Sequence, residues 1–249
     1  MKKLLFTALF SATALLYAQD KIIVEYRQVN EYDEEKLKQS NAELAQKGGI
    51  QFGSIKFPDI LYKLEVNEGF LNYDKIQSVN NNQGAGNASF SISVGGEFKN
   101  TTSTISEQKF RQEVVLDGKK YTVVTPYKTY NWKITDIEDV ILGYKVIKAV
   151  GEINGRKVAA WYAPDLPINA GPNQINGLPG LVLKSVTEMG GKMGLIMNFT
   201  AEKINKNPKK FTKLKPFTAP EISQDDFKKL QDESRKKMLE SFGGVDLKL

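Results

Sequence analysis

The sequence predicts a mainly β protein: a curved antiparallel meander sheet or half-open barrel, with a short N-terminal helical insertion and a C-terminal helix. Short runs of apolar, β-branched and aromatic residues recur from residue 22 to about residue 200. The dipeptides Asp117-Gly118 and Asn154-Gly155 separate such runs and are typical of tight β-hairpin turns. No helical pattern between the runs is long enough for the crossover of a parallel sheet, so antiparallel neighbours are expected.

Three segments make up the predicted organisation: a signal peptide (residues 1–18), a β domain (residues 19–200), and a Lys- and Pro-rich extended segment with a helix packing on the same domain (residues 201–249). Lys2 and Lys3 precede an apolar run that ends near Ala18, the layout of a signal peptide. The alternative is a membrane anchor, but a run of about fourteen residues falls short of the ~20 that span a bilayer. We therefore expect an exported protein of the periplasm, cell surface or medium, without a transmembrane segment after signal removal.

The expected elements follow in chain order. Strands are predicted at residues 22–29, 60–66, 70–73, 110–116, 121–125, 131–134, 141–153, 157–162, 181–186 and 193–199. Residues 32–47 predict a short helix on the rim of the sheet, with a mobile insertion as the competing interpretation. Residues 78–104 predict a long loop with one short edge strand at residues 90–94. Ser223 is expected to cap a helix that runs to about residue 242.

Residues 161–185, WYAPDLPINAGPNQINGLPGLVLKS, form the stretch around which the chain is organised. Proline fixes φ and glycine reaches positive φ at low cost, so their density between residues 164 and 180 specifies one irregular path. Leu166, Ile168, Ile175 and Leu178 require burial, which a flexible linker does not offer. We expect an ordered loop held against the edge or mouth of the sheet.

This stretch resembles the GLPGLI family of exported Bacteroidetes proteins. The resemblance rests on the segment Gly177-Leu178-Pro179-Gly180-Leu181-Val182, preceded by Gly171-Pro172 and by Trp161-Tyr162-Ala163-Pro164, and covers residues 120–185 closely. Val182 replaces the usual final isoleucine, Asn173 stands where an aromatic residue is common, and Val146 where a cysteine is frequent. The family has no established activity, so the resemblance implies an export route and an organism group but no catalytic residues.

Composition excludes several chemistries. The chain has no cysteine and no histidine, so disulfides, thiol catalysis, Ser-His-Asp triads and ordinary zinc, copper or haem sites are not expected. Without Lys2 and Lys3, 33 basic residues face 29 acidic ones; this charge of +4 is scattered and does not indicate nucleic-acid binding. We predict no catalytic residue, no metal site and no cofactor, and a protein more consistent with binding than with catalysis.

Two enzymatic alternatives remain open. Asp136, Glu138 and Asp139 are the densest acidic cluster of the predicted sheet region and could supply the paired carboxylates of a glycosidase, although a solvated turn is the preferred interpretation. Lys184 and Ser185 supply the residue types of a hydrolytic dyad, but adjacent residues on a strand point to opposite faces.

Aromatic residues concentrate in the strands that lead into the organising loop. Tyr and Trp combine a large apolar surface with a polar group and suit the wall of a binding site, although each is also an ordinary core residue. The predicted ligand-binding residues are Trp132, Tyr144, Trp161, Tyr162, Leu178, Pro179 and Leu181. The hypothesis is a non-enzymatic envelope protein that binds an apolar or peptide ligand or an outer-membrane partner protein. Its alternatives are a structural component of an outer-membrane complex and a carboxylate-dependent hydrolase.

Overall fold

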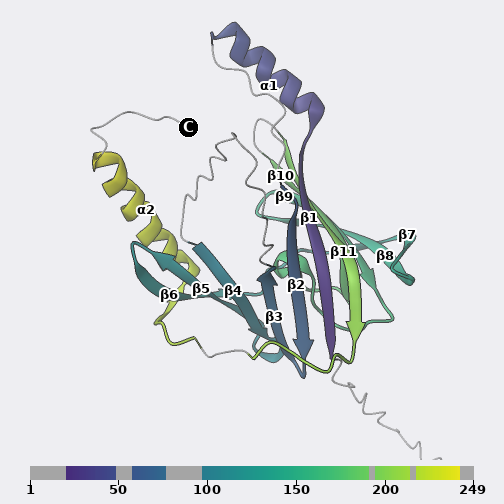
Figure 1. Cartoon of the computed structure of the whole chain (residues 1–249). Coiled ribbons are helices and arrows are strands. Elements are labelled where there is room, and N and C mark those ends of the chain that lie inside the picture. The colour runs from purple at the N-terminus through teal and green to yellow at the C-terminus, as the bar shows by residue number, and fades with distance from the viewer. Residues whose placement is uncertain (1–20, 49–57, 77–96, 191–193, 214–216, 242–249) are drawn as a thin grey trace, which may run out of the picture.

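A single open sheet of 12 strands dominates the computed structural model, which describes residues 21–48, 58–76, 97–190, 194–213 and 217–241 (Figure 1). The first meander contains β1 (Ile22–Tyr32), β2 (Ile60–Asn67), β3 (Phe70–Lys75), β4 (Glu97–Thr104), β5 (Lys109–Leu116) and β6 (Lys119–Pro126). The second contains β7 (Lys133–Ile141), β8 (Tyr144–Ile153), β9 (Arg156–Ala163), β10 (Leu181–Gly190) and β11 (Leu195–Lys206). The short strand β12 (Glu221–Ser223) follows near the end.

The strand order is β12-β6-β5-β4-β3-β2-β1-β11-β10-β9-β8-β7. Each meander pairs its strands in chain order, and antiparallel pairing of β1 with β11 joins the two meanders into one sheet. Strand β12 adds to β6 in parallel, while the other pairs are antiparallel. The predicted mainly β, antiparallel meander class is therefore confirmed.

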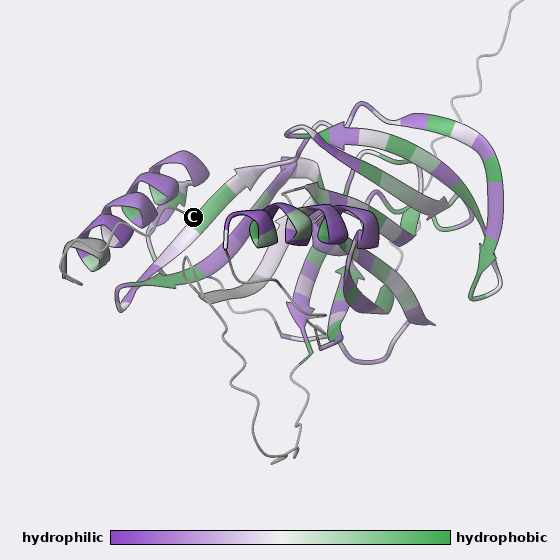
Figure 2. Cartoon of the chain, turned by 90° about the horizontal axis from the view of Figure 1, so that it is seen from above, coloured by the Kyte–Doolittle hydropathy of each residue, from purple (hydrophilic) through white to green (hydrophobic). Residues whose placement is uncertain are grey.

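The connection between the meanders explains why the sheet curves. Strands β6 and β7 lie near opposite edges, and in a flat sheet ten spacings of about 4.8 Å would separate them by roughly 48 Å. Residues 127–132 join Pro126 to Lys133, and a chain of this length reaches at most about 25 Å. The sheet therefore has to bend so that its two ends approach each other, and the curvature is visible from above (Figure 2).

The organising loop fills part of the curved sheet. Leu166, Ile168 and Ala170 are buried in one apolar cluster with side chains of β1, β2 and β3, whereas Ile175 and Leu178 belong to a second cluster with β8 and β9. The loop thus lies in the core and is not confined to the mouth of the sheet, because its alternating apolar residues need burial on both sides.

Two helices lie outside the sheet. Helix α1 (Glu34–Gln46) follows β1 and projects beyond the strand ends (Figure 1); the Asp33 carboxylate accepts hydrogen bonds from the N–H groups of Glu35 and Lys36 and begins the helix. Helix α2 (Gln224–Ser241) is capped by Ser223, whose hydroxyl oxygen accepts from the Asp226 N–H at 3.1 Å, as predicted. Neither helix of the described segments is long and apolar enough to cross a membrane.

A strap of chain after β11 connects the second meander back to the first. It passes β2, where the Thr212 N–H donates to the Glu65 carboxylate, and reaches β6, where the Thr122 N–H donates to the Pro220 carbonyl. Figure 1 shows the described residues that follow β11 running below the strand ends. The strap explains why Glu65 is buried although its side chain is charged.

Most predicted strands are confirmed, as are the two hairpin turns. Asp117, Gly118, Asn154 and Gly155 all have positive φ, as the predicted turn type requires.

Two local predictions were wrong. Residues 97–104 were assigned to a loop but form β4, in which Thr101 and Ser103 are buried. The acidic cluster at residues 136–139 was assigned to a turn but lies within β7, and the turn falls at Leu142 and Gly143. In both strands polar side chains interrupt the apolar alternation that sequence reasoning detects. The predicted signal peptide and the edge strand at residues 90–94 lie outside the described residues.

Candidate functional site

An open hollow of about 1140 Å³ lies between the connection from β6 to β7 and the strands β8, β9 and β10. We call it the lysine hollow, because Lys128, Lys133, Lys148 and Lys157 line it. Tyr127 and Thr129 of the connection form one wall together with Thr125 and Pro126 at the end of β6, and Gln224 at the start of α2 also contributes.

An apolar row lies across the three strands of the hollow. Val150 on β8 faces Ala159 on β9, and Ala159 faces Val186 on β10, so the three side chains share one face of the sheet. All three line the hollow. The register therefore builds a small apolar surface at a position where side chains remain partly accessible.

The next row on the same face is cationic and aromatic. Trp161 faces Lys148 on one side and Lys184 on the other. The two ammonium groups lie 5.2 Å and 4.7 Å from the centroid of the Trp161 ring, within the range of a cation–π contact. Lys148 lines the hollow, so Trp161 borders it through this contact.

The position of the connection is fixed by its aromatic residues. Tyr127 stacks on Phe110 of β5 at 4.6 Å, and its hydroxyl lies 2.8 Å from that of Ser103. Tyr130 stacks on Trp132 at 4.8 Å and is buried, which raises the pKa of its hydroxyl to about 12. Lys128 lies between these two anchors and is therefore held at the wall of the hollow.

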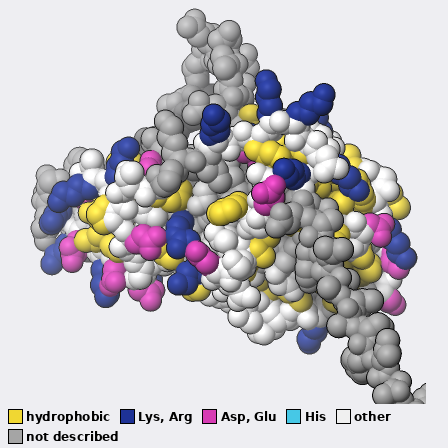
Figure 3. Space-filling view, turned by 90° about the horizontal axis from the view of Figure 1, so that it is seen from below, with side chains coloured by type: hydrophobic (Ala, Val, Ile, Leu, Met, Phe, Trp, Pro, Cys, Tyr) yellow, Lys and Arg dark blue, Asp and Glu magenta, His cyan; other side chains and the backbone are white. Residues whose placement is uncertain are grey.

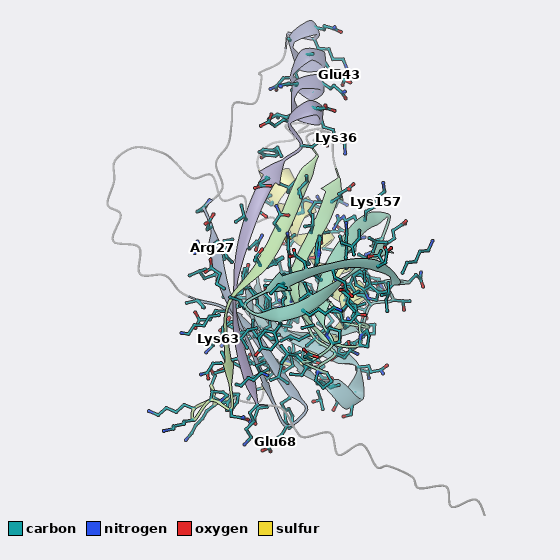
Figure 4. All side chains as sticks on the ribbon, turned by 90° about the vertical axis from the view of Figure 1, so that its right-hand side faces the viewer. Arg27, Lys36, Glu43, Lys63, Glu68 and Lys157 are labelled. Carbon is teal, nitrogen blue, oxygen red and sulfur yellow. The ribbon has the colours of Figure 1, made fainter. Side chains whose placement is uncertain are left out.

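Charges around the hollow are unbalanced. Glu152 and Glu188 are the acidic residues among its lining side chains, against four lysines. Among the described residues none of these six forms an ion pair. Burial, together with the nearby charge of Arg156, lowers the pKa of Lys128. Lys157 extends from the β8–β9 hairpin end on the right of Figure 4 and leaves its ammonium accessible.

The predicted ligand-binding residues do not form one surface. Tyr162, Leu178 and Leu181 are buried core side chains, and Pro179 is exposed. Trp132 is half-buried and donates its indole N–H to the Asn176 carbonyl at 2.9 Å.

Two further residues of this set are also half-buried. Tyr144 carries the Lys206 ammonium 4.9 Å above its ring. Trp161 contacts Lys148, a lining residue of the hollow, but does not line the hollow itself. A binding role of these residues stays a prediction. Lys128 was not among the predicted residues, because only the fold brings it together with the other lining residues.

The organising loop, also called here the proline–glycine loop (residues 164–180), is held by backbone and side-chain contacts. The Leu181 and Val182 N–H groups donate to the carbonyls of Leu166 and Ala170 at 2.8 and 3.0 Å, so the end of the loop pairs with its beginning. The Tyr26 hydroxyl donates to the Val182 carbonyl at 2.7 Å inside the core. The loop is therefore a rigid part of the core that supports β9 and β10 beneath the hollow.

The acidic residues considered for hydrolysis lie apart from the hollow. Asp136, Glu138 and Asp139 are exposed on β7, and Glu138 pairs with Lys145 at 2.7 Å. Ser185 is buried without a hydrogen-bond partner for its hydroxyl among the described residues, while the neighbouring Lys184 lies over Trp161 on the other face. Within the same residues no group of three or more carboxylates is arranged to hold a metal ion.

A family model described as "Protein of unknown function (Porph_ging)" matches residues 98–184. The matched segment spans β4 to β10 and includes both the wall of the lysine hollow and the proline–glycine loop. A comparison with curated proteins gives no match.

Solved structures with a similar fold include PNGF-II in two crystal forms. The C2 form is 18% identical with a TM-score of 0.54, and covers 87% of this chain and 33% of PNGF-II. The P21 form is 18% identical with a TM-score of 0.53, and covers 87% and 34%. The chain therefore spans about a third of the length of PNGF-II, and the likeness concerns the fold.

A putative outer membrane lipoprotein-sorting protein domain from Vibrio parahaemolyticus is 11% identical, with a TM-score of 0.31 and coverage of 86% and 92%. A similarity at this TM-score supports no inference for this chain.

Proposed function

We propose that the protein is an exported, non-enzymatic binding protein of the GLPGLI family, and that the lysine hollow holds its ligand. The observation that carries this proposal is the open hollow of about 1140 Å³, which combines an apolar row with unpaired cations above a rigid core. A volume of this order matches the sites in which proteins bind small molecules. The signal-peptide pattern of residues 1–18 supports export, to the periplasm, the cell surface or the medium.

The apolar row indicates an apolar ligand or the apolar side chains of a peptide. Val150, Ala159 and Val186 offer neighbouring aliphatic groups, and burying them against a ligand gains about 25 cal/mol per Å² of apolar surface. Trp161 at the border of this row adds an aromatic surface.

Native mass spectrometry of the mature protein, purified gently from its own cell envelope, tests this proposal. We expect a co-purifying small molecule or peptide, and its loss from the variant Ala159→Trp, whose indole covers the apolar row between Val150 and Val186. Ala45→Trp, on the exposed side of α1, is the matched control and should keep the ligand. A wild-type protein that is consistently free of ligand, or an Ala159→Trp variant that keeps it, would refute the hollow as the binding site.

A specific observation also favours a second candidate, a structural component of an envelope complex. Ile134, Ile137 and Val140 on β7 are 56%, 50% and 66% exposed, and β7 is the outermost strand at its end of the described sheet. Exposed apolar side chains on an unpaired strand edge are typical of a protein contact. A photo-crosslinker placed at Val140 should then capture one defined partner in intact cells, whereas a crosslinker at Lys119 should not.

A further inference from the structure

The charge of the lysine hollow narrows the class of ligand, if the proposed function holds. Lys128 is half-buried in the wall, yet no carboxylate of the described residues pairs with it. Arg156 adds a second positive charge that acts on the same ammonium group. A desolvated cation beside another cation costs folding free energy, and this cost is offset when an anion binds.

The backbone at Lys128 is held in place. Its neighbour Tyr127 is fixed by stacking on Phe110, and Tyr130 is buried against the core two residues further on. The backbone on both sides of Lys128 is therefore anchored, and its side chain starts from the wall of the hollow. The anchored backbone limits the region that the Lys128 ammonium can reach, so the loop itself needs little additional ordering when a ligand binds.

Apolar and cationic groups lie side by side in the hollow. The row of Val150, Ala159 and Val186 is next to the row that contains Lys148, and Lys133 and Lys157 are exposed lining residues. Exposed lysines attract an anion before it binds, whereas the half-buried Lys128 is placed to contact it directly.

From this arrangement we infer that the lysine hollow binds an apolar molecule that carries a carboxylate or phosphate group, and that the Lys128 ammonium contacts this group. The apolar part of the ligand covers Val150, Ala159 and Val186. A neutral molecule of the same length lacks the charge that compensates Lys128 and binds more weakly.

Calorimetric titration of the mature protein tests the inference, with laurate and dodecyl phosphate below their micelle concentrations and dodecanol below its solubility limit. We expect wild type to bind at least one of the two anions at least about tenfold more tightly than dodecanol, a difference of about 1.4 kcal/mol. In Lys128→Met the ratio of the affinity for that anion to the affinity for dodecanol should fall below about threefold. The control Lys119→Met removes an exposed lysine of β6 outside the hollow and should keep it. A preference for laurate or for dodecyl phosphate identifies the acidic group.

Folding is monitored in the same variants. Lys128→Met should melt at the same temperature as wild type or higher, because it removes a desolvated charge, so weaker binding would not reflect unfolding. Equal affinities for the anions and dodecanol, or an unchanged preference in Lys128→Met, would overturn the anion contact and leave the hollow as an apolar site. Absence of binding by all three compounds would overturn both this inference and the proposed function.

Discussion

Gly180→Ala is predicted to destabilise the protein, because the end of the proline–glycine loop packs directly on β9. A Cβ atom at residue 180 would lie 2.3 Å from the Ala163 carbonyl oxygen and 3.0 Å from a ring carbon of Tyr162. The first contact is with backbone, so β9 or the loop has to move to relieve it. The backbone of Gly180 does not lie in the left-handed region, so the loss of stability comes from the steric clash and not from backbone strain.

Overpacking of this kind costs about 1–3 kcal/mol. In a protein of this size each kcal/mol lowers Tm by about 2–4 °C, so we expect a fall of about 2–12 °C. Thermal and urea unfolding of the purified protein measure the change. The adjacent exposed Pro179→Ala is the control, and it should cost no more than about 0.4–1 kcal/mol, through the entropy of the unfolded chain. If Gly180→Ala lost no more stability than Pro179→Ala, the loop would be free to shift and would not be part of the rigid core.

Three further predictions concern other contacts. Burial raises the pKa of Glu65, but bonds from Thr212 and Asn72 and the charge of Lys63 lower it by more, so its folded pKa lies below the ordinary 4.5. Glu65 therefore stabilises the fold fully above pH 4.5 and loses this effect as pH falls through the lower folded value. The excess stability of wild type over Glu65→Gln, about 1–3 kcal/mol in urea unfolding at pH 7, should accordingly shrink in acid; a constant difference across pH would contradict this. Ser185→Ala removes a buried hydroxyl without a described partner and should leave Tm unchanged or raise it by the equivalent of about 1 kcal/mol; a marked fall in Tm would mean that the hydroxyl is satisfied. Trp132→Phe deletes the donor to the Asn176 carbonyl and should cost about 1–3 kcal/mol in urea unfolding, with no effect expected on dodecanol binding; unchanged stability would show that this bond does not hold the loop.

The predictable part of the fold is local. Asp117-Gly118 and Asn154-Gly155 predict their hairpins because few residues adopt positive φ at two consecutive positions. Ser223 predicts the start of α2 because its hydroxyl accepts a hydrogen bond from a helix N–H that would otherwise lack an acceptor.

The parts that sequence reasoning missed depend on neighbours far along the chain. Strand β4 consists largely of polar residues, and it forms because β3 and β5 supply backbone partners on both sides. Strand β7 carries three acidic residues, and a position at the sheet edge tolerates them because one side faces solvent. The pairing of β1 with β11 has no local signal in either strand.

Some features of the candidate site could likewise be predicted from the sequence, and others could not. The density of proline and glycine correctly predicted an ordered loop. The burial expected for Leu178 was also correct, but a buried Leu178 is not on the accessible surface where a ligand would bind. Nothing in the sequence distinguishes Lys128 from a surface lysine; only the fold brings it into the lining of the hollow and near the charge of Arg156. Figure 3 shows basic and acidic side chains interspersed on one face of the molecule. The excess of lysines over acidic residues in the hollow is not shared by this face.

Hydrogen–deuterium exchange of the purified protein with and without a saturating anionic ligand, laurate or dodecyl phosphate, tests the central claim most directly. We predict slower exchange in residues 125–131 and in the facing segments of β8, β9 and β10, with no change in α1 or in residues 135–141 of β7. Protection confined to residues 135–141, or no protection at saturation, would contradict the lysine hollow as the binding site.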